Sequence, residues 1–338
     1  MMMLIKKLAS LRLALVGMAV LALLAFAGSR SPSIDIGLTA IPLSLLTCNL
    51  LAAILTNRSM RAQNGLLIFH VGLLLVFVLI GVSVLTRFDG HVEVVQGVAF
   101  DSEAVEVTKQ GWLHRGNLRQ VQFTQGDIQV DYLPGLVRQA TRSTITYPLA
   151  TNSVRSITIG DKRGAEFSGY RFLATFNKGF ALVLRWQDNA GNTEYGSIHF
   201  PSFPLNDWRQ VTEWLTPNGQ SIEFEIDFAE PVVQADSRWV LQQPDIPYVV
   251  RISSKGLAPV TVRNGDKLEV SGGSVRVEDL RLWMAYRVDY YPYLPWLFVA
   301  AMLAIGGLAM HFGSRYLPQR KTVPASIVEV TRASVAGN

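Results

Sequence analysis

Cysteine is almost absent from this sequence of 338 residues, which contains only Cys48. A single cysteine excludes an intrachain disulfide, a Cys-x-x-Cys redox pair and a Cys-x-x-Cys-His haem attachment site. Any haem held by this chain alone would therefore be held non-covalently. The common catalytic signatures are missing as well, because there is no phosphate-binding glycine loop, no His-Glu-x-x-His and no Gly-x-Ser-x-Gly. The sequence accordingly predicts no catalytic residue.

Acidic residues are scarce outside residues 87–290. That part of the chain holds ten of the 31 Lys and Arg but only two of the 26 Asp and Glu. Inside 87–290 the remaining 21 basic residues meet 24 acidic ones, so this stretch is mildly acidic. The basic pI thus belongs to sequence that flanks apolar runs, and the pattern argues against nucleic-acid binding.

Long uncharged runs are abundant, in keeping with 49% hydrophobic residues and a mean hydropathy of +0.24. At a rise of about 1.5 Å per residue, about 20 such residues cross a hydrocarbon core of about 30 Å. We expect four transmembrane helices, three in an N-terminal membrane region of residues 1–86 and one in residues 291–338. Their expected bounds are about 9–28, 38–55, 65–85 and 293–312. The first run, with Ala25-Phe26-Ala27 at its end, also fits a cleavable signal peptide.

The cations beside the four runs are unevenly distributed between the two sides of a four-span arrangement. Only Arg30 of the ten falls on one side, which by the positive-inside rule faces away from the cytoplasm. The rule predicts a multi-pass protein of the cytoplasmic (inner) membrane with both termini cytoplasmic and residues 87–290 periplasmic or otherwise extracytoplasmic. The entry to the last run carries an expected aromatic girdle, formed by Tyr290, Tyr291, Tyr293 and Trp296.

Residues 87–290 read as a mainly β domain. Alternation of apolar and polar residues with a period of two runs through VEVTK, SIEFEIDF and the sequence around Asn264. Asn264-Gly265 predicts a hairpin and Gly126-Asp127 a turn between strands. One helix is expected from Asn206 or Asp207 through Leu215, ending before Pro217.

Histidine is the residue type that points to chemistry. His70 falls inside the third run, where an ionisable side chain is costly and commonly serves a pathway, a partner or a cofactor. His311 lies near the end of the fourth run at a similar expected depth, and two helices are able to present a histidine pair to haem iron. A histidine in that place also interacts favourably with the negative end of the helix dipole. His91 follows the third run at the outer interface, as a cofactor contact or a plain polar residue.

Other polar groups favour structural roles. Cys48 and Asn49 lie in the second run, where helix packing and an amide hydrogen bond to a neighbouring helix fit better than a metal or redox role. His114 and His199 lie among ordinary residues of the β domain, and we expect them to be structural.

Two stretches carry a family resemblance: LASLRLALVGMAVLALLAFAG near the start, and the run from His70 through Phe88-Asp89-Gly90-His91-Val92 to Gly97. Together with three spans, a large β-rich outer domain and a last span, they resemble the ResB (CcsB) family of system II cytochrome c biogenesis. The outer domain is short for that family, and Asp289-Tyr290-Tyr291-Pro292 stands where many members have an Asp-Pro-Gly-like turn.

The resemblance implies a subunit of a membrane cytochrome c synthase that handles a transient, non-covalent haem b. Its third-span histidine, an axial ligand of haem iron, aligns with His70. Implied partners are a CcsA/ResC-like multi-span membrane protein, apocytochrome c and a thioredoxin-like thiol reductant. The tryptophan-rich haem-presenting segment is not in this chain and belongs to the partner. The chain is therefore expected to be a non-autonomous part of a haem lyase.

Two other classes stay open from the residues alone. One is a membrane-anchored β-domain scaffold or adaptor without a cofactor, in which His70 makes only an interhelical hydrogen bond. The other is a transporter permease, which is weakened because only one span carries a clear ionisable group.

Overall fold

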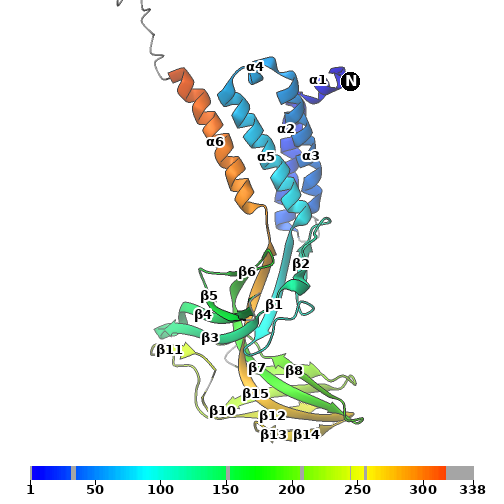
Figure 1. Cartoon of the computed structure of the whole chain (residues 1–338). Helices are drawn as coiled ribbons and strands as arrows, with labels where there is room; N and C mark the ends of the chain where they lie inside the picture. Colours follow the sequence, from blue (N-terminus) through cyan, green and yellow to red (C-terminus); the bar gives the residue numbers. More distant parts are fainter. Residues whose placement is uncertain are drawn as a thin grey trace, which may run out of the picture. The chain divides into compact units, whose positions relative to one another are not determined.

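Two units make up the chain in the computed structural model, which describes residues 2–31, 36–149, 153–205, 209–243, 245–254 and 257–316. The first unit contains the described residues up to Leu85 and from Pro292 onward, and it is helical. The second unit, Thr86–Tyr291, is built of strands (Figure 1).

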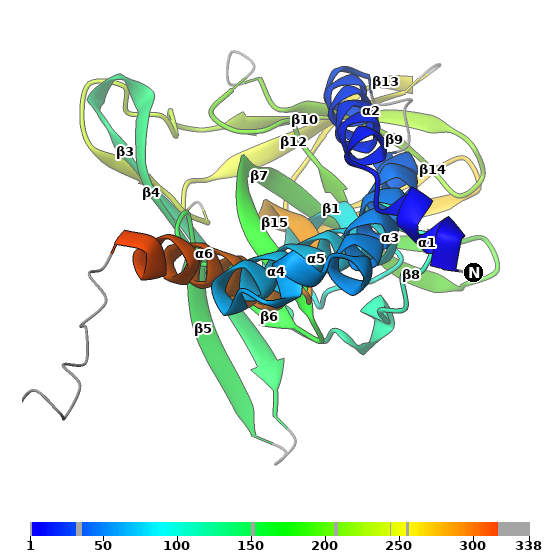
Figure 2. The same ribbon diagram turned by 90° about the horizontal axis from the view of Figure 1, so that it is seen from above.

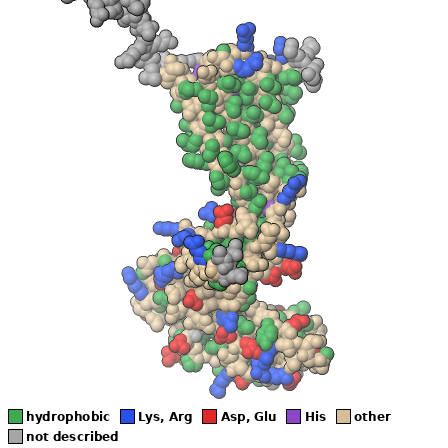
Figure 3. All heavy atoms as spheres, in the orientation of Figure 1, with side chains coloured by type: hydrophobic (Ala, Val, Ile, Leu, Met, Phe, Trp, Pro, Cys, Tyr) green, Lys and Arg blue, Asp and Glu red, His purple; other side chains and the backbone are tan. Residues whose placement is uncertain are grey.

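Four helices of the first unit are long and apolar enough to cross a membrane, over Leu11–Arg30, Gly37–Thr56, Asn64–Thr86 and Leu294–Ser314. The bounds of these helices lie within a few residues of the expected runs. Hydrophobic side chains cover this unit, and charged ones gather over the strands (Figure 3). The helical elements are α1 (Met2–Leu8), α2 (Leu11–Arg30), η1 (Ile36–Thr39), α3 (Ala40–Thr56), α4 (Arg58–Arg61), α5 (Asn64–Thr86) and α6 (Leu294–Tyr316).

Helices α2 and α3 pack together through a small residue and an amide. A Cβ at Gly17 would lie only 3.0 Å from the Leu46 side chain, so glycine permits this close approach. The Asn49 side-chain amide donates to the carbonyls of Leu8 and Ser10, the latter at 3.0 Å, and Asn49 is 7% exposed. The expected amide bond to a neighbouring helical segment is thus confirmed. Cys48, on the same helix, is exposed.

The β unit contains three sheets whose paired strands are all antiparallel. The central sheet has the order β2 (Glu106–Gln110), β1 (Phe88–Val95), β15 (Gly273–Tyr290), β7 (Tyr170–Asp188) and β6 (Ala165–Phe167), with β14 (Lys267–Val270) also beside β15 and β8 (Thr193–His199) also beside β7. The second sheet is β11 (Trp239–Leu241), β3 (Thr124–Leu133), β4 (Val137–Pro148) and β5 (Val154–Gly160). The third is β13 (Leu257–Val262), β12 (Tyr248–Ser254), β10 (Ser221–Phe228) and β9 (Val211–Leu215).

The long strands β7 and β15 run through the whole unit and contribute to one continuous core. A buried polar group ties β15 to the second sheet: the Tyr286 hydroxyl donates to Gln125 Oε1 at 2.6 Å and lies 2.8 Å from Ser143 Oγ. Gln125 and Ser143 also bond each other at 2.7 Å, and all three residues are fully buried. Such a network stabilises only while every member keeps its partner.

We predict that Tyr286→Phe destabilises the chain by about 1–3 kcal/mol, because it leaves the buried Gln125 oxygen without its donor. The measurement is denaturant unfolding of the detergent-purified full chain. Tyr195→Phe, at a tyrosine that is 69% exposed, serves as control and should change the unfolding free energy by less than about 0.5 kcal/mol. Equal stability of the two variants would contradict the role assigned to the network.

The helix expected from Asn206 or Asp207 through Leu215 is wrong where the structure describes it, since Val211–Leu215 is strand β9; residues 206–208 lie outside the described residues. Trp214 pairs with Ile222 and packs edge-on against Trp186. Pro217 and Gly219 lie in the turn of a hairpin, closed by the Thr216 amide on the Gln220 carbonyl at 2.9 Å. Cross-strand pairing and aromatic packing outweigh the weak helical pattern of five residues.

The two expected turns, at Asn264-Gly265 and at Gly126-Asp127, also differ from the prediction. The turn at Asn264-Gly265 forms, but β13 before it pairs in the third sheet and β14 after it pairs in the central sheet, so it connects two sheets and makes no hairpin. Gly126-Asp127 is a bulge inside β3, where the register with β4 shifts between Gln125 and Ile128. SIEFEIDF, by contrast, is strand β10 as expected.

Candidate functional site

His70 lies on α5, whose 23 residues contain no Asp, Glu, Lys or Arg. Its Nδ1 is 2.7 Å from the Leu66 carbonyl oxygen, one turn back on the same helix. A carbonyl oxygen only accepts, so Nδ1 is the donor, and in the neutral ring Nε2 then carries the lone pair. The ring meets Phe69 edge-on at 4.9 Å between centroids, and His70 is half-buried. Metal-binding histidines commonly have this arrangement, in which one nitrogen donates to a carbonyl and the other ligates.

Helices α5 and α6 approach each other through small residues, and α6 lies beside α5 in both views (Figures 1 and 2). A Cβ added at Gly65 would lie 2.5 Å from the His311 backbone nitrogen, and one at Gly72 would lie 2.5 Å from that of Ala304. A Cβ at Gly307 would likewise collide with the Phe69 backbone. We call Gly65, Gly72, Ala304 and Gly307 the glycine seam.

The contacts of the glycine seam give the position of His311 relative to His70. The backbone of His311 lies against Gly65, so His311 belongs to the face of α6 that contacts α5. His70 lies five residues after Gly65, which is about 140° around the helix and about 7.5 Å along it. His311 is therefore level with Gly65, whereas His70 lies about 7.5 Å further along α5 and on a different face of that helix from the one that contacts α6.

His91 lies in β1 and so belongs to the other unit. It is directly opposite Arg287 on β15 and Glu106 on β2, and it is half-buried. Among the residues that the structure describes, no group of three or more His, Cys, Asp or Glu is arranged to hold a metal ion.

A pair of Arg-x-Asp sequences on β1 and β15 forms a cluster that the sequence reasoning missed. Asp89 and Asp289 are directly opposite each other in the antiparallel pair. Arg287 donates to Asp289 through Nε at 3.0 Å and through a terminal nitrogen at 2.8 Å, and Arg87 Nε lies 3.9 Å from Asp89. The Tyr291 hydroxyl donates to Asp89 at 2.5 Å.

These contacts offset the repulsion that two opposed carboxylates produce. The hydrogen bonds from Arg287 to Asp289 raise the pKa of the Arg287 guanidinium above its usual value. Burial, followed by the hydrogen bond to Asp89, raises the pKa of the Tyr291 hydroxyl. Asp289 is only 5% exposed, and its Oδ1 has no hydrogen-bond partner among the described residues. The repeated Arg-x-Asp pattern, Arg87-Phe88-Asp89 and Arg287-Val288-Asp289, was the available signal, but only strand pairing reveals that the two sequences meet.

A second missed residue is Lys178 in β7, which is 3% exposed. Its ammonium donates to the Phe176 carbonyl at 3.0 Å and lies 5.9 Å from the centre of the Tyr132 ring, which also stacks with Trp239. Burial, together with the nearby Arg138, lowers the pKa of Lys178 to about 8, against the opposite effect of Asp161. Lys178 is the only charged residue in the sequence FNKGFALVL.

The remaining histidines have structural contacts. The His114 Nδ1 donates to the Thr86 carbonyl at 2.8 Å, and the Tyr170 hydroxyl donates to its Nε2 at 2.8 Å. His199 bonds Glu93 and stacks on Trp283, with 5.6 Å between ring centroids. Tyr290 packs against His114 at 4.9 Å, so this member of the expected girdle contributes to an aromatic cluster.

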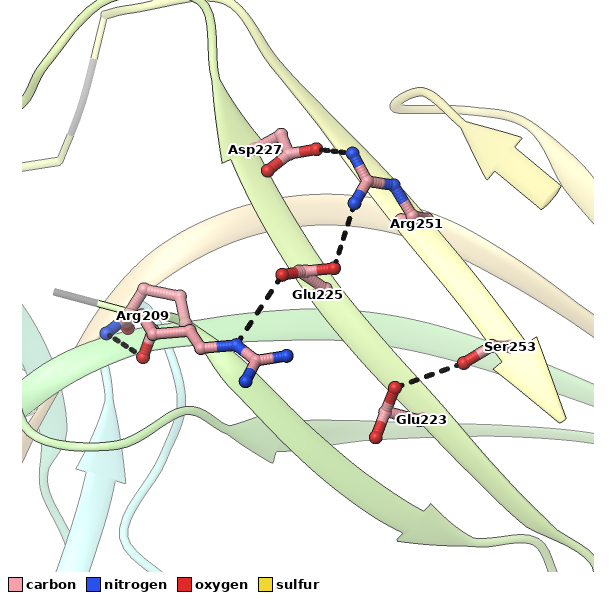
Figure 4. A network of polar contacts seen from close by, with 7 residues as sticks. Arg209, Glu223, Glu225, Asp227, Arg251 and Ser253 are labelled. Atoms are coloured by element: carbon pink, nitrogen blue, oxygen red, sulfur yellow. Dashed lines mark hydrogen bonds and ion pairs between the residues drawn. The ribbon is translucent and has the colours of Figure 1, made fainter. Parts of the chain in front are cut away.

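The carboxylates of the third sheet lie on a solvated face and are matched by cations, as Figure 4 shows. Glu225 and Asp227 both bond Arg251 across the strand pair, and Glu225 lies 3.7 Å from Arg209. Glu223 accepts a hydrogen bond from Ser253 at 3.1 Å. These contacts are ordinary cross-strand ion pairs and hydrogen bonds, and they do not indicate a catalytic acid/base pair.

No protein-family model matches this chain, and no curated protein is detectably similar to it. The fold therefore defines only a class: a protein whose described residues contain four helices long and apolar enough to cross a membrane and a large, mainly β unit.

Proposed function

We propose that this chain is a ResB-like, haem-handling subunit of a membrane cytochrome c synthase. The observation that carries the proposal is the state of His70 in an otherwise uncharged span. Its Nδ1 proton is donated to the Leu66 carbonyl, and its Nε2 lone pair points away from that bond on a half-buried ring. Neutral imidazole in this form is a common axial ligand of haem iron.

The proposed roles of the residues follow from their positions. His70 binds the iron, and the Leu66 carbonyl holds the imidazole in the ligating tautomer. The second axial ligand comes from the multi-span partner, because His70 lies on a different face of α5 from the one that contacts α6 and His311. Bound haem would supply the group that is attached to apocytochrome c. With Cys48 as its only thiol, the chain supplies no redox chemistry, and the β unit docks the partner, the apocytochrome or a thiol reductant.

The proposal includes an orientation and a location. The excess of Lys and Arg beside the spans places both termini in the cytoplasm and the β unit outside it. His70 lies six residues into α5, about 9 Å from the start of that helix. It would then bind haem in the cytoplasmic half of the membrane.

The test is an absorption spectrum of detergent-purified protein, prepared with and without its partner subunit. His70→Ala is expected to lose most of the Soret absorbance or to shift it, and added imidazole is expected to restore it. His311→Ala is the matched control and should retain the wild-type spectrum. If the His70→Ala spectrum equals the wild type with haem present, the ligand lies elsewhere. If no preparation contains haem, the cofactor-free adaptor is the better hypothesis.

A further inference from the structure

A short loop beside the end of α5 carries two exposed apolar side chains. Trp112 is 65% exposed and Leu113 is 53% exposed, and they are consecutive. The exposed Arg115 follows them, and the half-exposed Lys109 precedes them. A tryptophan and a leucine flanked by cations have the composition of segments that bind the lipid headgroup region.

The loop is held against the residue that ends the span. His114 donates from Nδ1 to the carbonyl of Thr86, the last residue of α5, at 2.8 Å. The Gly111 amide donates to the Arg87 carbonyl at 2.9 Å, and the His114 amide donates to the Gly111 carbonyl at 3.0 Å. Trp112 and Leu113 therefore lie between two residues, Gly111 and His114, that are bonded to the backbone of Arg87 and Thr86.

The base of the loop is rigid. The His114 ring packs against Phe88 at 5.2 Å and Tyr290 at 4.9 Å between centroids, and Tyr170 bonds its second nitrogen. A Cβ at Gly116 would collide with the Tyr170 hydroxyl, so the chain beyond His114 is also closely packed. Trp112 and Leu113 thus project from a fixed support, and their exposure is a consequence of the fold.

The length of α5 gives the expected depth of Thr86 in the membrane. Its 23 residues span about 34 Å, slightly more than a hydrocarbon core of about 30 Å. Thr86 therefore lies at the boundary between acyl chains and headgroups, and so do side chains held beside it. Tryptophan is enriched at this depth because its ring is apolar and its N–H bonds to water or headgroups.

We propose that Trp112 and Leu113 form an interfacial membrane anchor that inserts into the lipid headgroup region where α5 leaves the membrane. The anchor is a contact of the β unit with lipid, additional to the four spans and independent of any haem role. The occupant of this apolar surface is the lipid itself, since the loop is bonded to the end of a membrane-spanning helix.

The test uses the full chain with Cys48→Ala, so that single cysteines introduced by substitution carry a nitroxide label. Trp112→Cys is compared with Tyr195→Cys, which is 69% exposed in β8, and with Val78→Cys inside α5. The labelled proteins are placed in nanodiscs of phosphatidylcholine and phosphatidylglycerol. Collision with oxygen and with a water-soluble nickel chelate is then measured by power-saturation electron paramagnetic resonance.

We expect the label at 112 to collide with the nickel chelate about fivefold less than the label at 195, and more than the label at 78. Equal nickel accessibility at 112 and 195 would overturn the proposal. The nanodiscs contain only this chain and lipid, so protection seen in native membranes but not in nanodiscs would assign the surface to a protein partner and would also overturn it.

A second measurement needs no cysteine. Phosphatidylcholine with brominated acyl chains quenches tryptophans that lie in the membrane, so the wild-type chain should lose more fluorescence than Trp112→Phe. Trp296→Phe is the reference for a tryptophan within a span, at 64% exposure on α6. The same quenched fraction in the wild type and in Trp112→Phe would contradict the anchor.

Discussion

Gly307→Ala is expected to weaken the contact of α6 with α5, while the same substitution one residue earlier is not. A Cβ at position 307 collides with the backbone of Ile68 and Phe69, which cannot rotate away as a side chain would. Forcing an extra methyl group into such a contact costs about 1–3 kcal/mol. We therefore expect Gly307→Ala to lower the unfolding free energy of the detergent-purified chain by about that amount, measured by denaturation in mixed micelles.

The chain provides a matched control in Gly306, where a Cβ would meet nothing within 4 Å. Gly306→Ala should be neutral or slightly stabilising, because alanine is the better helix former by about 1 kcal/mol. The same comparison is available on α5, with Gly72→Ala as the disruptive variant and Gly81→Ala as its control. If the two members of each pair unfold alike, the glycine seam does not hold the helices together.

Lys178→Met is expected to stabilise the chain at neutral pH, although it removes a hydrogen bond. Burial lowers the pKa of Lys178 from the usual 10.5 to about 8, so the folded state holds a poorly solvated ammonium at pH 7. Each unit of pKa shift corresponds to about 1.4 kcal/mol of stability gained when the ammonium is removed. Loss of the hydrogen bond to the Phe176 carbonyl offsets about 1 kcal/mol of that gain. A net gain of about 2 kcal/mol follows, measured by denaturant unfolding at pH 7.

The pH dependence distinguishes this cause from a simple packing gain. Between pH 8 and pH 10.5 the unfolded chain binds more protons than the folded one at this residue, so wild-type stability rises with pH over that window. Lys178→Met should abolish this rise. Lys162→Met, at an exposed lysine, should keep both the wild-type stability and the rise. A variant of Lys178 that is less stable at pH 7, or that keeps the rise, would mean that the ammonium is well paired.

Much of the helical unit was predictable because its signal is local. The uncharged run that contains His70 was expected over residues 65–85 and is α5, Asn64–Thr86. Length and apolarity within about 20 consecutive residues decide whether a helix can cross a membrane, and both are readable without any contact. The predicted β character of strands such as Ser221–Phe228 followed from their two-residue period in the same way.

Strand pairing was not predictable from the same pattern. Alternation with a period of two marks a strand but is the same for every possible neighbour, so it does not specify which strands pair. Asn264-Gly265 forms the expected turn, but the strands on its two sides belong to different sheets. Val211–Leu215 is a strand because Trp214 pairs with Ile222 and packs against Trp186. Both partners lie outside the segment, so its own sequence does not reveal them.

The candidate site likewise has features that the sequence predicted and features that only the structure revealed. The sequence by itself determined that His70 is the ionisable group of an uncharged span, because charge and length are properties of consecutive residues. Only the tertiary structure decided that His311 on α6 lies against Gly65 of α5, away from the face that carries His70, and that Asp89 lies opposite Asp289. These are contacts between residues up to 246 positions apart in the numbering, and their geometry arises from packing that no local period contains.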